Sequence, residues 1–366
     1  MNTDEEFMLE CLTLAEKGAG YASPNPMVGS VIVRDGKIIG RGYHKKFGEP
    51  HAEINAIRNS TRPVKGATMY VNLEPCSHHG KTPPCADALI AAGISRVVIG
   101  MKDPNPAVSG KGISRLRRAG VRVDTGVLEP ECRKLNRAFS KYITTRVPYV
   151  SLKIAQTADG KIADGKGKSQ WITSVASRQM VHRLRSQYDG VLVGAGTIEN
   201  DNPHLTVHDV KGRNPARIVL TPSLDLSFDA HVLSNAQKER VILFADPSCV
   251  RKQEKKIKML SARGVKVFFL PRHSNGMFSL PEVLRILGEQ DLTSVLVEGG
   301  AATFSEFLKQ KTADEAFIFV APKILGRGLD AFAGLQSLNI GSEVSFSSTE
   351  FHRVGPDLMI EASLNF

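Results

Sequence analysis

The segments PHAE at residues 50–53 and PCSHHGKTPPC at residues 75–85 decide how the first half of the chain folds. The second segment lies between a strand pattern, ATMYVNL at 67–73, and a helix pattern, CADALIAAG at 85–93. Proline suits the first turn of a helix, because the N–H that it lacks has no partner there. We therefore expect His51 and Cys85 in the first turns of two helices, with a strand delivering Cys76 beside them.

Strand and helix patterns alternate on both sides of these segments. A helix pattern at 4–18 precedes a hairpin pattern at 30–43, whose turn is Asp35-Gly36. A helix pattern at 128–146 ends the first series. After Pro148 a second alternating series begins, and the chain ends in a hairpin pattern at 343–366. The sequence therefore predicts a layered α/β fold in two domains, residues 1–146 and 147–366.

The composition is that of a globular protein. Of 366 residues, 42% are hydrophobic and 23% charged, which excludes wholesale disorder. No apolar run is long enough to span a membrane, and the acidic N-terminus lacks the features of a signal peptide, so we expect a cytoplasmic protein. Five cysteines without such a signal argue against a disulfide framework. The net charge of +11 suits either nucleic acid or a phosphorylated metabolite.

His51, Cys76 and Cys85 have the chemistry of zinc ligands. Three protein ligands leave the fourth tetrahedral position open to water, as in a catalytic site. Glu53 follows His51 too closely to be an obvious second ligand from the same helix. It can instead reach a water on the metal and move its proton to a leaving group.

Other interpretations of these residues stay open at this point. His44, His78 or His79 could replace His51 as the ligand, and the two cysteines could be a redox pair or unrelated buried thiols. A single His-x-Glu motif is weak evidence for a zinc site. The three elements in this order, each next to proline and at the start of a helix or after a strand, favour zinc.

These motifs resemble the zinc-dependent cytidine deaminase superfamily, with its His-x-Glu and Pro-Cys-x-x-Cys. The chain departs from that spacing, because eight residues separate its two cysteines. The longer insertion is similar to the deaminase half of the bifunctional riboflavin-biosynthesis deaminase/reductases. The segments SPNPMVGSVIV at 23–33, GYHKKFGEPHAE at 42–53 and KDPNPAVSGKG at 102–112 also resemble that family.

The resemblance implies hydrolytic deamination of 2,5-diamino-6-(5-phosphoribosylamino)pyrimidin-4(3H)-one, with Glu53 as the catalytic proton shuttle. The substrate contacts that it implies lie in the matching motifs and are Asn25, His44, His78, Lys81, Thr82, Asp103 and Asn105. From the residues alone, Lys81 suits a phosphate contact, whereas Asn25 and Asn105 precede prolines and could only shape turns.

The second half of the chain carries two glycine-rich strand ends. GVLVGAGTIENDNP at 190–203 contains Gly194-x-Gly196, but Glu199 stands where a dinucleotide-binding fingerprint has its third glycine. In SVLVEGGAATFSEFL at 294–308 a strand runs into a helix that begins near Ala301. Free N–H groups there could bind a phosphate, or the glycines could only form a tight turn.

Both strand ends lie in segments that resemble the reductase half of the same family, a domain similar to dihydrofolate reductase. These segments are LKIAQTADGKIA at 152–163, SQWITS at 169–174, GVLVGAGTIENDNPHLTV at 190–207 and VEGGAATFSEFL at 297–308. The resemblance implies NADPH-dependent reduction of the ribosyl group to ribityl phosphate.

The resemblance also assigns roles to residues of this half. The implied NADPH contacts are Ala155, Trp171, Thr197, Asp201, Gly300, Ala301, Ala302, Thr303, Phe304, Ser305 and Glu306. The implied substrate contacts are Ser169, Arg185, Leu205, His208 and Glu298. Lys153 and Asp201 are the expected catalytic residues. At position 208 the family commonly has Arg, so Lys211 or Arg213 could supply the phosphate contact in place of His208.

The resemblance spans residues 4–366 and explains the basic excess without nucleic acid, since substrate and cofactor both carry phosphates. We expect a homo-oligomer, a dimer or tetramer, that binds one catalytic zinc, NADPH and a phosphorylated pyrimidine. One rival is a tRNA-type deaminase with an appended binding domain, but aromatic residues form only 6% of the chain. Another is a nucleotide sensor with structural zinc, which would not need Glu53.

Overall fold

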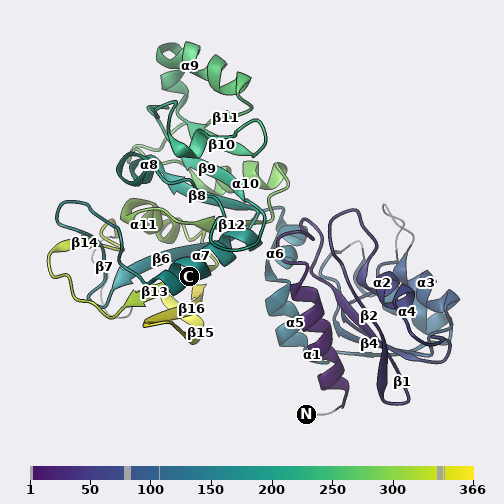
Figure 1. Cartoon of the computed structure of the whole chain (residues 1–366). Helices are drawn as coiled ribbons and strands as arrows, with labels where there is room; N and C mark the ends of the chain where they lie inside the picture. The colour runs from purple at the N-terminus through teal and green to yellow at the C-terminus, as the bar shows by residue number, and fades with distance from the viewer. Residues whose placement is uncertain (1–2, 78–83, 107, 336–340, 342) are drawn as a thin grey trace. The chain divides into compact units, whose positions relative to one another are not determined.

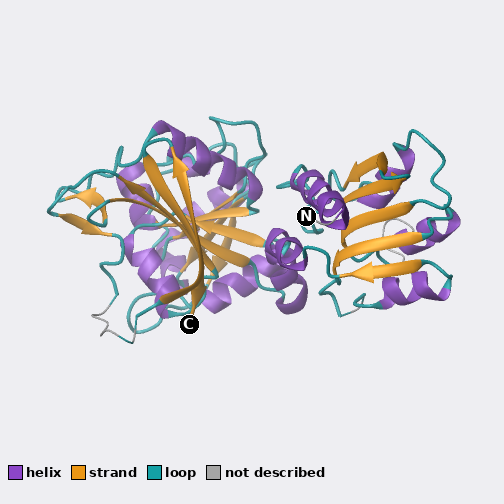
Figure 2. Cartoon of the chain, turned by 90° about the horizontal axis from the view of Figure 1, so that it is seen from below, coloured by secondary structure: helices purple, strands orange, loops and turns teal. Residues whose placement is uncertain are grey.

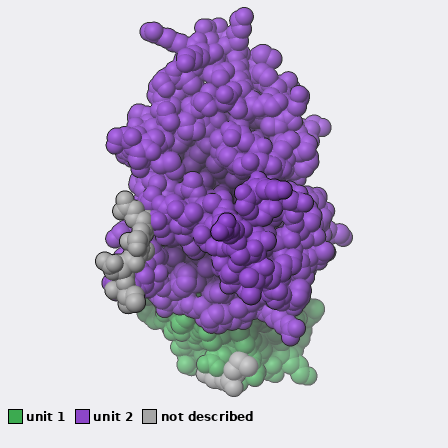
Figure 3. Space-filling view, turned by 90° about the vertical axis from the view of Figure 1, so that its left-hand side faces the viewer, with its two compact units in different colours: residues 1–146 green, residues 147–366 purple. Residues whose placement is uncertain are grey.

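The computed structural model describes residues 3–77, 84–106, 108–335, 341 and 343–366. The chain divides into two compact units, residues 1–146 and residues 147–366, which Figure 3 shows in different colours. Each unit is built around one main β-sheet with helices packed against it (Figure 1). The predicted α/β class is confirmed.

Unit 1 is a five-stranded sheet between two layers of helices (Figure 2). Its elements, in chain order, are α1 (Thr3–Glu16), β1 (Gly29–Arg34), β2 (Lys37–Tyr43), α2 (Ala52–Arg58), β3 (Thr68–Leu73), α3 (Cys85–Ala91), β4 (Arg96–Met101), α4 (Lys111–Arg118), β5 (Arg122–Thr125), α5 (Glu129–Leu135) and α6 (Arg137–Thr145). The strand order is β2-β1-β3-β4-β5, and β3, β4 and β5 run parallel. The carboxyl ends of the parallel strands β3 and β4 lie side by side, so the residues that follow these strands are close together.

Alternation along the strands of unit 1 produces its three layers. Met69 and Val71 face one hydrophobic cluster, to which α2, α3 and α4 contribute, whereas Tyr70 faces a second cluster with α1 and α5. Side chains of a strand point to opposite faces in turn, so a strand apolar on both faces must be covered twice.

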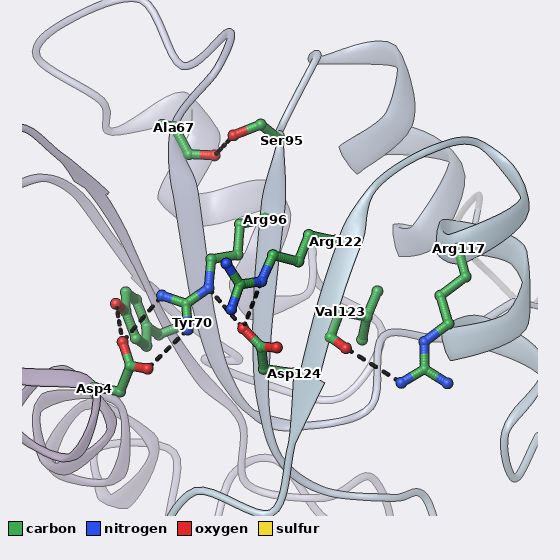
Figure 4. A network of polar contacts seen from close by, with 9 residues as sticks. All are labelled: Asp4, Ala67, Tyr70, Ser95, Arg96, Arg117, Arg122, Val123 and Asp124. Atoms are coloured by element: carbon green, nitrogen blue, oxygen red, sulfur yellow. Dashed lines mark hydrogen bonds and ion pairs between the residues drawn. The ribbon is translucent and has the colours of Figure 1, made fainter. Parts of the chain in front are cut away.

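A polar network also holds α1 to the sheet (Figure 4). The Asp4 carboxylate accepts hydrogen bonds from the Tyr70 hydroxyl at 2.6 Å and from the Arg96 guanidinium at 2.8 and 3.1 Å. Arg96 also donates to Asp124 on β5 at 2.7 Å. Hydrogen bonds from Arg96 are the largest cause that lowers the pKa of Asp4. The network joins α1, β3, β4 and β5.

Unit 2 is built on a nine-stranded sheet with the order β11-β10-β9-β8-β12-β6-β13-β16-β15, and β14 pairs separately with β7. Its strands are β6 (Tyr149–Thr157), β7 (Lys161–Asp164), β8 (Gly190–Gly194), β9 (Ala216–Leu220), β10 (Val241–Ala245), β11 (Lys266–Phe269), β12 (Ser294–Val297), β13 (Glu315–Ala321), β14 (Gly328–Asp330), β15 (Ser345–Val354) and β16 (Asp357–Asn365). Its helices are α7 (Val175–Gln187), α8 (Ala195–Asp201), α9 (Val250–Ala262), α10 (Leu280–Glu289) and α11 (Ala301–Lys309), with short 3₁₀ turns η1 (His231–Leu233) and η2 (Pro247–Cys249).

Helices cover both faces of this sheet. One hydrophobic cluster includes residues of α10 and α11, such as Leu287 and Phe307, and the other includes residues of α7 and α9, such as Leu184 and Leu260. The strands from β11 to β13 are parallel, and β16 and β15 add an antiparallel hairpin at one edge. This is the terminal hairpin predicted over 343–366.

Two local features differ from the sequence prediction. The helix expected over 128–146 is interrupted at Asn136, whose buried side chain accepts from the Met27 N–H at 2.8 Å and donates to the Met27 carbonyl at 3.0 Å. The sequence does not predict helix α8, because its residues include glycine and asparagine, which are weak helix formers.

In the part of the chain that the structure describes, no helix is long and apolar enough to cross a membrane.

Candidate active sites

The predicted zinc ligands come together in unit 1. His51 is the N-cap of α2, Cys85 is the first residue of α3, and Cys76 follows β3. The His51 Nδ1 atom lies 3.7 Å from Cys76 Sγ and 3.3 Å from Cys85 Sγ, and all three ligand atoms lie within 4.8 Å of one another. Tetrahedral zinc would hold nitrogen and sulfur ligands about 3.5 Å apart. The site therefore fits zinc.

Neighbouring groups favour the thiolate form of Cys76. The Cys85 thiol is the main cause that lowers the pKa of Cys76 to about 4, and the His51 ring and the Cys85 N–H, 3.2 Å from Cys76 Sγ, add to it. The start of α3 also favours negative charge at this point, as helix N-termini do. A thiolate at Cys76 is the form that binds zinc.

Glu53 is the second residue of α2 and is buried, with 3% of its surface exposed. Burial, followed by the nearby Cys76, raises the pKa of its carboxyl to about 7. A buried carboxyl in this position can take up and give back a proton close to the metal ligands. The position and burial of Glu53 support the proton-transfer role that the sequence predicts, which stays a prediction.

The buried His44 and the half-buried Asn25 form a hydrogen-bonded pair next to the ligands. The Asn25 amide donates to His44 Nε2 at 3.1 Å, so the His44 proton lies on Nδ1, 3.3 Å from the Pro50 carbonyl. Burial lowers the pKa of His44, which keeps the ring neutral. The ring meets that of His51 edge-on, with 5.2 Å between centroids. Asn25 therefore has a partner at the site and does more than shape a turn.

Glu74 organises the neighbouring edge of unit 1, and the sequence did not point to it. Its buried carboxylate accepts four backbone hydrogen bonds of 2.9–3.3 Å, from Asp103, Gly110, Gly112 and Ile113. It thus caps α4 and ties the segment after β4 to the strand that leads to Cys76.

The predicted substrate residues of that segment lie at the same edge. Asp103 is buried, and one oxygen of its side chain accepts from the Asn105 N–H at 2.8 Å. The other predicted contacts, His78, Lys81 and Thr82, lie outside the described residues, as does the alternative ligand His79. Their roles stay predictions.

In unit 2, three predicted residues form one ion cluster, in which the Glu298 side chain is buried and those of Arg185 and Lys153 are half-buried. Glu298, at the end of β12, pairs with Arg185 of α7 at 2.6 and 2.9 Å and with Lys153 of β6 at 3.3 Å. Burial alone would raise the pKa of Glu298, but Arg185 and Lys153 hold it at about 2. Arg185 also donates to the Thr206 carbonyl. The cluster carries a net positive charge, as a site for a phosphorylated ligand should.

The two glycine-rich strand ends meet at Thr303 on α11. A Cβ atom on Gly299 would lie 2.6 Å from Thr303 Cβ, and one on Gly194 would lie 2.8 Å from Thr303 Oγ1. By contrast, a Cβ atom on Gly300 or Gly196 would meet nothing within 4 Å. Gly194 and Gly299 therefore serve close packing, whereas Gly196 and Gly300 border open space that a phosphate could enter. This part of unit 2 fits a phosphate-bearing cofactor such as NADPH.

The remaining predicted NADPH residues differ in accessibility. Ala301, Ala302 and Thr303 form the first turn of α11, where N–H groups lack helical partners. The N–H of Phe304 already bonds the Gly300 carbonyl, Ser305 Oγ accepts from Gly334, and Glu306 accepts from Gln310. We therefore expect residues 304–306 to contribute by packing.

The other members of this group lie on β6, α8 and the loop before α7. Asp201, the last residue of α8, accepts a hydrogen bond from the Ser169 hydroxyl at 2.8 Å. Trp171 is 65% exposed, and the Arg178 guanidinium lies 4.5 Å from its ring centre. The predicted residues Ala155 and Thr197 are half-buried, on β6 and α8.

The predicted substrate residues after α8 lie in different surroundings. Leu205 is buried in the core of unit 2 with a positive φ of 55°, whereas His208 is exposed and packs edge-on against His182, with 4.0 Å between ring centroids. Of the two cations that could replace His208 on a phosphate, Arg213 is paired with Asp189. Lys211 is exposed.

Comparisons with known proteins cover both units. The family model of the RibD C-terminal domain matches residues 148–360, and that of the cytidine and deoxycytidylate deaminase zinc-binding region matches residues 1–101. The riboflavin biosynthesis protein RibD of Aquifex aeolicus is 44% identical over 98% of this chain and 97% of its own length. That of Escherichia coli is 39% identical over 98% of each chain.

Solved structures agree over the whole length. The diaminohydroxyphosphoribosylaminopyrimidine deaminase/5-amino-6-(5-phosphoribosylamino)uracil reductase of Thermotoga maritima is 42% identical, with a TM-score of 0.85 over 99% of both chains. RibD of Acinetobacter baumannii is 34% identical, with a TM-score of 0.89 over 100% of this chain and 99% of its own. With both family models, full-length relatives and the fold in agreement, the chain belongs to the RibD family of riboflavin biosynthesis proteins.

Proposed function

We propose that the chain catalyses two consecutive steps of riboflavin synthesis. Unit 1 deaminates 2,5-diamino-6-(5-phosphoribosylamino)pyrimidin-4(3H)-one by hydrolysis, and unit 2 reduces the ribosyl group of the product to ribityl phosphate with NADPH. The family membership supports both steps, because the Thermotoga relative is named as both a deaminase and a reductase. Membership of this family also argues against the two rival functions, a tRNA-type deaminase and a nucleotide sensor.

The observation that carries the deaminase step is the buried Glu53 beside His51, Cys76 and Cys85. Zinc held by these three ligands would supply Lewis acidity and lower the pKa of water. Glu53 can accept a proton from the attacking water and give it to the amino group, so that the ring carbon gains a C–O bond, loses its C–N bond and releases ammonia. His44 and Asn25 line the same site and orient the pyrimidine through their fixed hydrogen-bond pattern.

In unit 2 the Lys153–Glu298–Arg185 cluster supports the reductase step. Lys153 is held at Glu298 by an ion pair, and its ammonium group can polarise and orient the ribosyl group. The two glycine-rich strand ends hold the cofactor, with N–H groups of Ala301–Thr303 available to a phosphate. NADPH supplies the hydride that reduces the sugar carbon.

Metal removal separates the two steps. A chelator should abolish ammonia release from the diaminopyrimidine substrate, and added Zn²⁺ should restore it. The same chelated protein should still oxidise NADPH when the deaminated product is supplied, because Lys153 and Glu298 lie in unit 2 and the zinc ligands lie in unit 1. Ammonia release that survives complete metal removal would overturn the deaminase assignment.

A further inference from the structure

We propose that His182, His208 and Asp209 form a second site for a divalent transition metal of the zinc class. Their ligand atoms lie within 4.8 Å of one another. Asp209 Oδ2 lies 3.5 Å from His182 Nε2, and Asp209 Oδ1 lies 3.7 Å from His208 Nε2. Tetrahedral zinc would hold nitrogen and oxygen ligands about 3.4 Å apart. The three groups therefore need only a small inward movement to share one cation.

His182 is the fixed member of this cluster. It belongs to α7, and its side chain is only 8% exposed. Within the described residues its Nδ1 atom is buried without a hydrogen-bond partner. A neutral imidazole has one N–H and one lone pair, and hydrogen-bond partners decide which nitrogen holds the proton. With no partner at Nδ1, no hydrogen bond on that side fixes the tautomer, so the proton can move to Nδ1 when Nε2, the nitrogen that faces Asp209, binds a cation.

The protonation state of the ring suits a metal better than an ion pair. Burial, followed by the charge of Arg185 and by His208, lowers the pKa of His182 to about 4. The ring is therefore neutral at pH 7, and its contact with Asp209 is not a salt bridge. Metals bind the neutral form of imidazole.

The surrounding charges allow a cation here. The positive charge of Arg185 acts on His182, but Glu298 pairs with Arg185 through both carboxylate oxygens, which compensates that charge. Asp209 supplies a further negative charge, and the side chains of His208 and Asp209 are 56% and 44% exposed. An ion can therefore enter from solvent, and the remaining coordination position can hold water or an anion. The site lies in a different unit from the Cys76–Cys85 site and has no thiolate.

Metal counting on the full chain tests this proposal. Protein stripped of metal and equilibrated with Zn²⁺ should bind two ions per chain. At a Zn²⁺ concentration that just fills both sites of the unaltered chain, the variants His208→Gln and Asp209→Asn should bind one ion, because the altered site binds at least about tenfold more weakly. Both positions are exposed, so these variants should fold even where His182→Gln does not. The matched control His273→Gln, at another exposed histidine, should still bind two.

Cobalt identifies which site is filled. Co²⁺ at the Cys76–Cys85 site should show thiolate charge-transfer absorption, and a second equivalent should add visible bands without it. Only this second component should disappear in His208→Gln. The proposal is overturned if the unaltered chain binds one metal, or if His208→Gln and Asp209→Asn retain both. Neither result would affect the deaminase or the reductase assignment.

Discussion

The Glu298 carboxylate receives the Arg185 guanidinium through two parallel hydrogen bonds of 2.6 and 2.9 Å, although 113 positions separate them in the sequence. The pair joins the end of β12 to α7, and Lys153 completes it from β6. Two parallel hydrogen bonds between a guanidinium and a carboxylate are strong and fix the orientation of both groups. It positions the predicted substrate residues of unit 2 relative to one another.

Removing the charge of Glu298 should destabilise unit 2. In Glu298→Gln the guanidinium of Arg185 stays buried without its counter-charge, which costs about 3–5 kcal/mol. Urea unfolding of the full chain, followed through a probe in unit 2, measures the loss. Glu282→Gln, which breaks an exposed pair with Arg285, is the control and should leave that transition unchanged. Equal stability of both variants would contradict the buried role of Glu298.

The stability of unit 2 should fall in acid because of the same carboxylate. The folded-state pKa of Glu298, about 2, lies below the value of about 4.3 for an unfolded chain. The stabilisation is therefore complete above about pH 4.3 and is lost as the pH falls towards 2. Unfolding free energies of the unaltered chain and Glu298→Gln, measured from pH 6 to 3, should converge. A constant difference would show that the Glu298 proton is not involved.

Two adjacent glycines should give opposite results when changed to alanine. Gly299→Ala places a Cβ 2.6 Å from Thr303 Cβ, so it should lower the stability of unit 2. Gly300→Ala meets no atom within 4 Å and should fold normally, but it should weaken NADPH binding about tenfold by filling the space next to the α11 N-terminus. Thermal unfolding and cofactor titration separate the effects. Unchanged NADPH affinity in Gly300→Ala would exclude this turn from the cofactor site.

Glu74 should be a positioning residue for deamination. In Glu74→Gln an amide NH₂ group replaces one carboxylate oxygen and faces backbone N–H donors, so at least one hydrogen bond is lost, at a cost of about 1–3 kcal/mol. The segment with Asp103 and Asn105 then loosens, which should raise the KM for the diaminopyrimidine more than it lowers kcat. Steady-state kinetics tests this, with the exposed Glu129→Gln as control. A fall in kcat alone would argue against positioning.

The sequence predicted the parts of the molecule that depend on local pattern. Proline, helix periodicity and a buried strand were sufficient to bring His51, Cys76 and Cys85 together, because each lies at the end of an element that the sequence defines. Glu74 was missed because its four N–H partners lie 29–39 positions further along the chain and reach it only through the parallel pairing of β3 and β4.

Long-range packing explains the other differences. The break at Asn136 depends on a hydrogen bond to Met27, 109 positions away, so helix periodicity could not reveal it. The roles of Gly299 and Gly300 looked alike in the sequence, and only the place of Thr303 separates them. The resemblance to the family supplied the chemistry of unit 2, which composition and spacing alone left open.

The coupled reaction tests the central claim most directly. The zinc-loaded full chain is given the diaminopyrimidine substrate and NADPH, and NADPH oxidation is followed by absorbance. We expect oxidation in the unaltered chain, none in Glu53→Gln, and recovery in Glu53→Gln when the deaminated product is supplied. Oxidation that persists in Glu53→Gln with the diaminopyrimidine would contradict the proton-transfer role of Glu53. No oxidation with the deaminated product would contradict the reductase assignment.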